Sequence, residues 1–165
     1  SPTVSPDGRW VYFLSWRSGL QLLWKIPAEG GEPVQVTDKP TGRVTFSPDG
    51  KLIAGAQLAP GGSAWQIAII PTDGSAPVKF IAQPTHVNIA TSLSWTPDGR
   101  AVLAKSDQGG VGNLWSFPID GGTPKQVTTF TSNQISNFAM SRDGKRLAVS
   151  RGHSNLDVVL IKDFR

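Results

Sequence analysis

The chain of 165 residues contains no cysteine, only two histidines, one methionine and one tyrosine. Without cysteine it has neither a disulfide framework nor a thiolate-ligated metal site. It has no apolar run of 18 or more residues, so we expect no membrane contact by this segment. Charged residues make up 17 %, and the net charge of +4 is dispersed rather than clustered. This dispersal argues against a nucleic-acid partner.

Glycine and proline, in contrast, are frequent, with 18 and 13 copies. Such a composition favours many short strands joined by tight turns rather than long helices. Six tryptophans and an apolar content of 38 % provide enough material for a packed core and argue against disorder. We expect four of the tryptophans to pack between elements, and Trp16 and Trp65, which lie at or beside loops, to be the better candidates for binding.

One tetrapeptide recurs four times along the chain, as Ser5-Pro6-Asp7-Gly8, Ser47-Pro48-Asp49-Gly50, Thr96-Pro97-Asp98-Gly99 and Ser141-Arg142-Asp143-Gly144. Its aspartates are 42, 49 and 45 residues apart, a period typical of four-stranded propeller blades. Proline suits the second position of a type I turn, and the final glycine accepts a left-handed backbone. We therefore predict a hairpin corner at each copy. We assign its aspartates and glycines structural roles.

Strand patterns surround each corner. Apolar and small residues alternate before it. An apolar run follows it, at 10–14, 52–54, 101–104 and 147–149, which predicts strands buried on both faces. A third apolar segment and a second glycine-containing turn follow. An outer strand, predicted over 34–37, 78–81 and 125–128, completes the first three repeats. The fold class predicted is all-β: a β-propeller fragment of about four blades of four-stranded antiparallel meanders. The blades span about 1–38, 39–83, 84–130 and 131–165.

The last repeat is shorter than the others. Only four residues follow its third segment, 157–161, so we expect the last blade to lack its outer strand. An unpaired edge invites aggregation. We therefore expect upstream blades of the same chain to supply that strand, with Arg165 at or near the natural C-terminus. The alternative is that four blades close as a small ring.

The corners, together with the segments LWKIPAEGGEPVQVT and LWSFPIDGGTPKQVT, resemble the WD-like propeller repeats of the TolB type. The end of the chain, from Ser141 to Arg165, resembles the C-terminal propellers of bacterial serine/threonine protein kinases and of winged-helix regulators. Similar repeats form the propellers of prolyl oligopeptidase-like peptidases. The resemblance implies a periplasmic or extracytoplasmic location, whereas the fold itself implies no particular activity.

Catalytic motifs are missing from the sequence. It has no GxGxxG loop, HRD, DFG or GxSxG. His86 and His153 belong to different blades, and the corner aspartates stand one per blade, so neither set is expected to form a catalytic or metal site. Basic residues follow each corner glycine, at Arg9, Lys51, Arg100 and Lys145, as a dispersed rim. We expect no enzyme activity in this chain, no metal and no cofactor.

The connections opposite the corners are longer and less uniform, at 15–19, 57–64, 105–112 and 150–155 within blades and 38–43, 83–92 and 129–136 between blades. Binding residues tend to lie on variable loops held by a rigid scaffold. We predict this loop face to be the interaction surface, with the polar candidates Arg17, Arg43, His86, Asn88, Asp107, Gln108, Asn133, Gln134, His153 and Asn155.

The function predicted is therefore a non-catalytic module that recognises a protein partner or a small ligand. We expect it to be the C-terminal sensor or scaffold part of a larger bacterial protein, such as a membrane-anchored serine/threonine kinase. Two alternatives remain: the propeller of a prolyl oligopeptidase-like peptidase, where it gates substrate access, and a TolB-like periplasmic envelope component.

Overall fold

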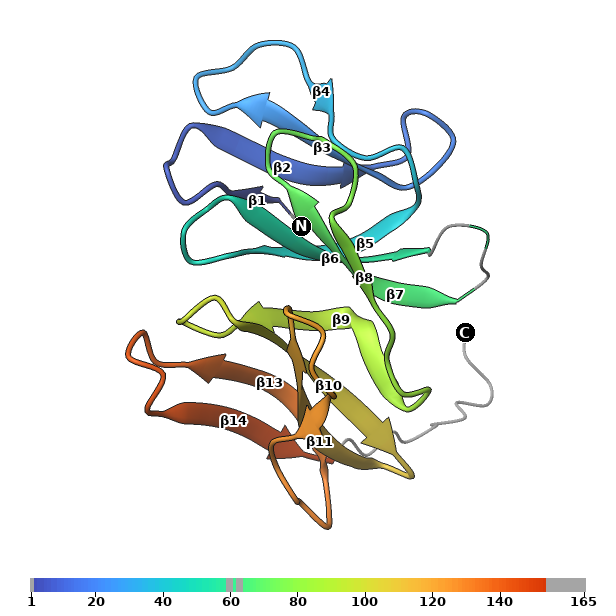
Figure 1. The fold of residues 1–165 in the computed structure, drawn as a ribbon, viewed down its shortest axis with the longest axis vertical. Helices are drawn as coiled ribbons and strands as arrows, with labels where there is room; N and C mark the ends of the chain where they lie inside the picture. Colours follow the sequence, from blue (N-terminus) through green and yellow to red (C-terminus); the bar gives the residue numbers. More distant parts are fainter. Residues whose placement is uncertain (1, 59–60, 62–63, 154–165) are drawn as a thin grey trace, which may run out of the picture.

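The computed structural model describes residues 2–58, 61 and 64–153, and all the regular elements within them are β-strands. These strands form four separate antiparallel sheets that stack along the molecule in sequence order (Figure 1). The described part of the chain contains no helix long and apolar enough to cross a membrane. The predicted all-β architecture is confirmed.

Three of the sheets are four-stranded meanders, in which each strand pairs with the next one in the chain. The first sheet, blade 1, contains β1 (Thr3–Val4), β2 (Trp10–Ser15), β3 (Leu22–Pro27) and β4 (Val34–Gln35). Blade 2 contains β5 (Thr41–Phe46), β6 (Leu52–Leu58), β7 (Trp65–Pro71) and β8 (Lys79–Ile81). Blade 3 contains β9 (Val87–Trp95), β10 (Ala101–Gln108), β11 (Val111–Pro118) and β12 (Lys125–Gln126).

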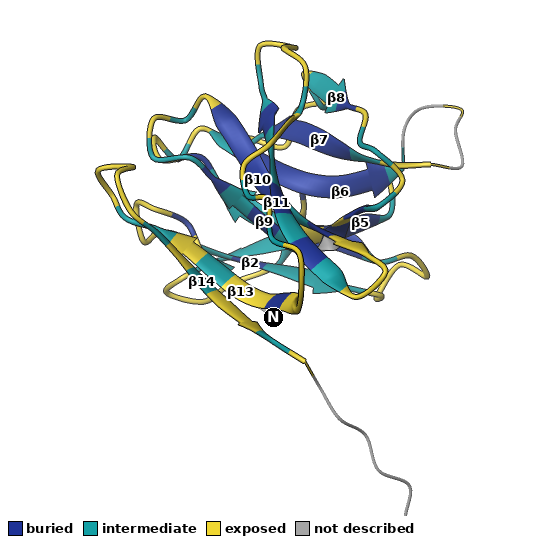
Figure 2. Cartoon of the chain, turned by 90° about the horizontal axis from the view of Figure 1, so that it is seen from below, coloured by how far each residue is buried: buried dark blue, intermediate teal, exposed yellow. Residues whose placement is uncertain are grey.

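The fourth sheet consists of β13 (Gln134–Met140) and β14 (Leu147–Gly152) within the described residues. Its predicted third strand, 157–161, and the predicted absence of an outer strand lie outside the described residues. Most residues of β13 and β14 are exposed, whereas β6, β7 and β10 are largely buried (Figure 2). The two middle sheets thus have a neighbour on each face.

The core lies between the sheets, because successive side chains of a strand point to opposite faces. In β6, Ile53 faces blade 1 and belongs to a cluster with Tyr12 and Leu23. Its neighbour Ala54 belongs to the other cluster, with Trp95 and residues of β10 and β11. The two clusters together join three blades into one stack. Burial on both faces is confirmed for β6 and most of β10. It is wrong for β2, in which only Tyr12 is buried, and for β14, in which no residue is buried.

Each corner is closed by the same hydrogen bonds. In the second copy, the Ser47 hydroxyl lies 2.6 Å from Asp49 Oδ1, and the Lys51 amide donates to the same oxygen at 3.1 Å. The Leu52 amide donates to Ser47 Oγ at 2.9 Å, and the Gly50 amide donates to the Ser47 carbonyl. The other three corners repeat this pattern, with Thr96 in place of serine in the third. The corner aspartates thus organise turns.

The corners also contact one another from blade to blade. The four corner glycines have φ between 68° and 73°, as predicted. A Cβ built on Gly50 lies 3.3 Å from the Pro6 side chain of the preceding corner. In the same way, a Cβ built on Gly99 lies 3.6 Å from the Pro48 side chain, and one built on Gly144 lies 3.9 Å from the Pro97 side chain. Successive corners therefore lie side by side on one side of the stack (Figure 1).

The outer strands are shorter than the sequence predicts. We expected strands over 34–37 and 125–128, but β4 and β12 end after two residues. The reason is a threonine whose hydroxyl replaces a backbone acceptor. The Leu23 amide donates to Thr37 Oγ1 at 3.0 Å, and the Leu114 amide donates to Thr128 Oγ1 at 2.9 Å. The chain thus turns away from the sheet without leaving these amides unpaired.

Candidate functional site on the loop face

The connections opposite the corners are shorter than expected, because strands extend into them. Arg43 lies inside β5 rather than in a loop, Asn88 lies on β9 and Gln134 begins β13. Asp107 and Gln108 end β10, and only Gly109 and Gly110, both with positive φ, separate them from β11. The prediction of long loops over 38–43, 83–92, 105–112 and 129–136 is therefore wrong in extent.

Several of the predicted residues meet in a cleft between blades 2 and 3. This blade 2–3 cleft has a volume of about 360 Å³ and is lined by Trp65, Gln83, Thr85, His86, Val87, Asn88, Ile89 and Asp107. It lies where the connection between the blades passes the end of β10. His86, Asn88 and Asp107 come from the predicted set, whereas Gln83 was not predicted to be a site residue.

The backbone holds the His86 side of this cleft firmly. The Asp107 amide donates to the His86 carbonyl at 3.1 Å, and the Val87 amide donates to the Pro84 carbonyl at 3.0 Å. The His86 ring makes an edge contact with the Trp115 ring, their centroids 5.2 Å apart. Asp107 Oδ1 accepts from the Gly110 amide at 3.1 Å, which ties the carboxylate to the two-glycine turn. The imidazole and the carboxylate are thus fixed in position.

Trp65 and Gln83 form the other wall. Trp65 is 41 % exposed and, with Trp16 at 67 %, is one of the two exposed tryptophans among the described residues. The Gln83 amide nitrogen donates to the Trp65 carbonyl at 3.5 Å, while its Oε1 is buried without a hydrogen-bond partner among the described residues. A buried acceptor of this kind favours a ligand that brings a donor. No sequence signal singled out Gln83, because its burial depends on how the two blades stack.

Trp65 also borders a second cleft, which lies beside β1 and β5, the first strands of blades 1 and 2. This inner cleft has a volume of about 440 Å³, and its lining includes Phe13, Gln21, Arg43 and Val44. The exposed Arg43 lines this cleft, His86 and Asp107 line the blade 2–3 cleft, and Trp65 lines both. Together, Arg43, Trp65, His86, Asn88 and Asp107 form one polar and aromatic area, which we call the Trp65 surface.

The remaining predicted residues lie elsewhere. Arg17 stacks on blade 1, with its guanidinium carbon 4.9 Å from the centroid of the Trp24 ring. Asn133 has a positive φ of 62°, and its carbonyl accepts from the Gly112 amide, so it shapes the connection between blades 3 and 4. Gln108, Gln134 and His153 are exposed and line neither cleft. Asn155 lies outside the described residues.

The chemistry that this surface offers is recognition by hydrogen bonds, charge and aromatic contact. Within residues 2–58, 61 and 64–153, no cluster of three or more histidine, aspartate or glutamate side chains is arranged to hold a metal ion. The corner aspartates lie on the opposite side of the blades, where each accepts hydrogen bonds from its own turn.

No family model matches the chain. Among curated proteins, it is 29 % identical over 160 residues to the uncharacterized peptidase YuxL of Bacillus subtilis, covering 94 % of this chain and 22 % of the relative. It is 42 % identical over 41 residues to the uncharacterized protein Atu1656 of Agrobacterium fabrum, covering 25 % of this chain and 14 % of the relative.

Among solved structures, the chain matches a TolB-type protein from Agrobacterium tumefaciens with a TM-score of 0.75 and 20 % identity, over 93 % of this chain and 54 % of that one. It matches TolB from Acinetobacter baumannii with a TM-score of 0.68 and 24 % identity, over 90 % of this chain and 36 % of that one. An acylaminoacyl peptidase from Pyrococcus horikoshii matches with a TM-score of 0.58 and 12 % identity, over 81 % of this chain and 25 % of that one. These likenesses establish the fold, a segment of a TolB-type β-propeller. The chain spans less than two thirds of each protein named.

Proposed function

We propose that this propeller segment is a non-catalytic recognition module, and that it binds a peptide segment of a protein partner at the Trp65 surface. One observation carries the proposal. At this surface an exposed tryptophan adjoins an arginine, an imidazole, a carboxylate and the buried, unpartnered Oε1 of Gln83. Exposed aromatic and arginine side chains are typical anchors of protein interfaces.

The clefts on either side of Trp65 suit an extended peptide better than a compact ligand. Their volumes are about 440 Å³ and 360 Å³, and Trp65 contributes to the lining of both. A peptide crossing Trp65 places one side chain in each cleft. Its charges then face Arg43 on one side and Asp107 on the other, and a backbone amide pairs with Gln83 Oε1.

The test is selection of peptides from a random displayed library against the intact chain, followed by affinity measurement with variants. Trp65→Ala and Asp107→Ala are expected to weaken binding at least tenfold, as loss of an interface anchor typically does. Arg100→Ala, an exposed change on the corner side, serves as the control and is expected to leave affinity unchanged. Peptides that lose affinity with Arg100→Ala, but not with Trp65→Ala, contradict the proposal.

A second candidate is the propeller of a peptidase, in which the segment gates access of substrates. The match over 160 residues to a curated protein named as a peptidase favours it. The corresponding test is hydrolysis of chromogenic aminoacyl and acyl-aminoacyl substrates by the longest protein that contains this chain. Hydrolysis that increases when Trp65 is replaced by alanine supports gating, and absence of hydrolysis removes this candidate.

Two narrower roles from the sequence stay predictions. A TolB-like envelope component is favoured by the fold alone, because the solved TolB structures are below 25 % identity. The serine/threonine kinase parent depends on the resemblance of residues 141–165, and none of the proteins reported above carries the name of a kinase. Cell fractionation of the parent protein distinguishes the envelope role from a cytoplasmic one.

A further inference from the structure

A third cleft, the outer cleft, lies between blades 1 and 2 at their outer strands. Its volume is about 490 Å³, within the range of roughly 300–1,000 Å³ that is usual for small-molecule sites. Its apolar lining includes Val36, Leu58, Ile70, Pro77 and Phe80. The cleft is separate from the Trp65 surface, with which it shares no lining residue.

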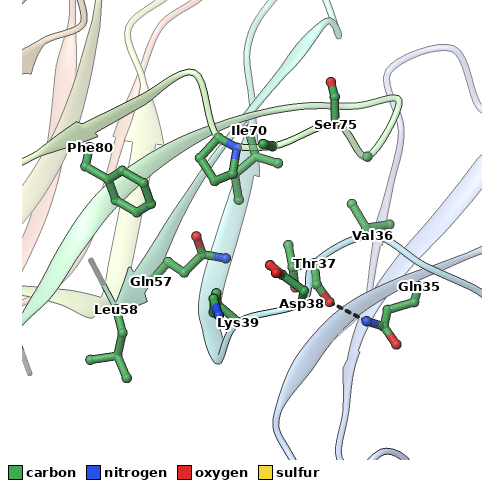
Figure 3. Close-up of a pocket in the computed structure, with 13 residues that line it drawn as sticks. Gln35, Val36, Thr37, Asp38, Lys39, Gln57, Leu58, Ile70, Ser75 and Phe80 are labelled. Atoms are coloured by element: carbon green, nitrogen blue, oxygen red, sulfur yellow. Dashed lines mark hydrogen bonds between the residues drawn. The ribbon is translucent and has the colours of Figure 1, made fainter. Parts of the chain in front are cut away.

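One polar group of the outer cleft is unexplained by the fold. The Gln57 side chain is 1 % exposed, and its Oε1 is buried without a hydrogen-bond partner among the described residues. Its amide lies between Phe80 on one side and Thr37 on the other (Figure 3). Folded proteins rarely leave such an acceptor unpaired, because its lost hydration is not replaced.

The neighbouring threonine fixes which atom of the Gln57 amide faces the cleft. Thr41 Oγ1 lies 2.8 Å from the Lys39 carbonyl and 3.0 Å from Thr37 Oγ1. The carbonyl can only accept, whereas the Thr37 hydroxyl can donate to Thr41, so the hydroxyl proton of Thr41 is directed to Lys39. Thr41 Oγ1 therefore accepts at its contact with Gln57, which places the amide nitrogen 3.2 Å away. The carbonyl oxygen Oε1 is left as the acceptor in the cleft.

Gln57 is also a departure from the repeat. The matching positions in blades 1 and 3, at the same place in the second strand, are Ser15 and Ser106. The Ser106 hydroxyl has a hydrogen-bond partner within its own blade, because it donates to the Asn113 carbonyl at 3.1 Å. Only in blade 2, among these three blades, does a long amide extend from this position into a cleft between two blades. The fold does not need an acceptor here.

We propose that the outer cleft binds a small apolar molecule that carries one hydrogen-bond donor. Its N–H or O–H group donates to Gln57 Oε1, and its apolar body packs between Phe80 and Ile70 of blade 2 and Val36 of blade 1. Asp38 and Lys39, which also line the cleft, have opposite charges, so the site favours a neutral ligand over an ion. Indole has the required chemistry: a flat apolar body with a single N–H.

The first test compares indole with benzothiophene, which has a similar shape but no donor. Both are titrated into the intact chain, and binding is followed by amide NMR shifts. Indole is expected to shift the Gln57 side-chain signal and the backbone amides of Ser75 and Phe80. It is expected to bind about fivefold more tightly than benzothiophene, as one neutral hydrogen bond implies. Equal affinities, or shifts confined to other residues, overturn the proposal.

The second test blocks the cleft without touching the core. Ala76 is exposed at the edge of the outer cleft, on the connection between β7 and β8. Ala76→Trp is expected to reduce indole binding at least tenfold, whereas Ala28→Trp, an exposed alanine on the matching connection of blade 1, is expected to leave it unchanged. Gln57→Met is expected to abolish the preference for indole over benzothiophene. An Ala76→Trp variant that binds indole normally contradicts the proposal.

Discussion

At the scale of single residues, the corner glycines show two separable effects. All four have a left-handed backbone, which costs other residues roughly 1–2 kcal/mol. Gly50 has, in addition, the Pro6 side chain against the position of its missing Cβ, whereas Gly8 has open space there. The same turn therefore exists both with and without a blade neighbour, which allows the contact to be measured.

We expect Gly8→Ala to destabilise the chain by about 1 kcal/mol, through the backbone conformation alone. Gly50→Ala is expected to cost more, because the new methyl group lies 3.3 Å from Pro6 Cγ and the two corners must move apart. Urea unfolding of both variants measures the difference. Equal losses of stability would show that the corners of blades 1 and 2 do not touch.

The corner carboxylates make the stability of the fold depend on pH in the acid range. The Ser5 hydroxyl, followed by the side chain and amide of Arg9, lowers the pKa of Asp7 from 3.8 to about 2. The Ser47 hydroxyl likewise lowers the pKa of Asp49, and the pKa values of Asp98 and Asp143 are lowered in the same way. A carboxyl whose pKa is lower in the folded state stabilises that state above its unfolded pKa.

We therefore expect the free energy of unfolding to decrease as the pH falls from about 4 towards 2, where the corner carboxylates become protonated. The measurement is urea unfolding at several pH values. Asp49→Asn keeps an oxygen that accepts from Ser47 but does not titrate. The free energy of unfolding of this variant should therefore decrease less steeply as the pH falls. An unchanged slope in this variant would mean that Asp49 contributes no acid dependence.

At the scale of the strand, threonine hydroxyls decide where the outer strands of blades 1 and 3 end. The Leu114 amide donates to Thr128 Oγ1, which in turn lies 2.9 Å from Asn113 Oδ1. The Gln126 side chain donates to the Thr128 carbonyl at 2.6 Å. Blade 1 repeats the arrangement with Thr37 and Gln35. The motif QVT thus marks the end of an outer strand.

Thr128→Val preserves the shape of the side chain but removes the acceptor for the Leu114 amide. We expect a loss of about 1–3 kcal/mol, the usual cost of leaving a buried donor unpaired. The adjacent Thr129, which is exposed, provides the control, and Thr129→Val is expected to change stability by less than about 0.5 kcal/mol. Thermal unfolding distinguishes them, and similar losses would refute the capping role of Thr128.

The strands and corners were predictable from the sequence because their causes are local. Alternation between apolar and small residues and the turn preferences of proline and glycine act within a few residues. The strand ends were not predictable in the same way. β4 ends early because the Thr37 hydroxyl accepts from the Leu23 amide, 14 residues away, and β10 continues to Gln108 because two glycines allow a tight hairpin.

At the scale of the whole molecule, the three clefts depend on how blades stack rather than on any one repeat. Besides the apolar clusters, hydrogen bonds join neighbouring blades. The Lys25 ammonium donates to the Thr72 carbonyl at 3.0 Å, and the Lys79 ammonium donates to the Ile119 carbonyl at 2.9 Å. Trp95 Nε1 donates to the Thr45 carbonyl at 3.0 Å. Each of these bonds connects a blade to the next one in sequence.

The clefts exist only because of this stacking, and for that reason the sequence predicted their residues incompletely. His86, Asn88 and Asp107 were predicted individually, from their position on one side of the blades. Their meeting with Trp65, the burial of Gln83 Oε1 and the burial of Gln57 depend on distances between sheets that no repeat pattern encodes. Gln108, Gln134 and His153 were predicted by the same argument, yet the stacking leaves them outside the clefts.

The claim that successive corners lie side by side is tested most directly by cross-linking, because the chain contains no cysteine of its own. A Cβ on Gly50 lies 3.4 Å from Pro6 Cβ, close to the separation of about 3.5–4.5 Å found in disulfides. The pair Pro6→Cys with Gly50→Cys should form a disulfide under mild oxidation. The pair Pro6→Cys with Gly99→Cys, two blades apart, should stay reduced. Equal oxidation of both pairs, or of neither, would contradict the stacked-blade account.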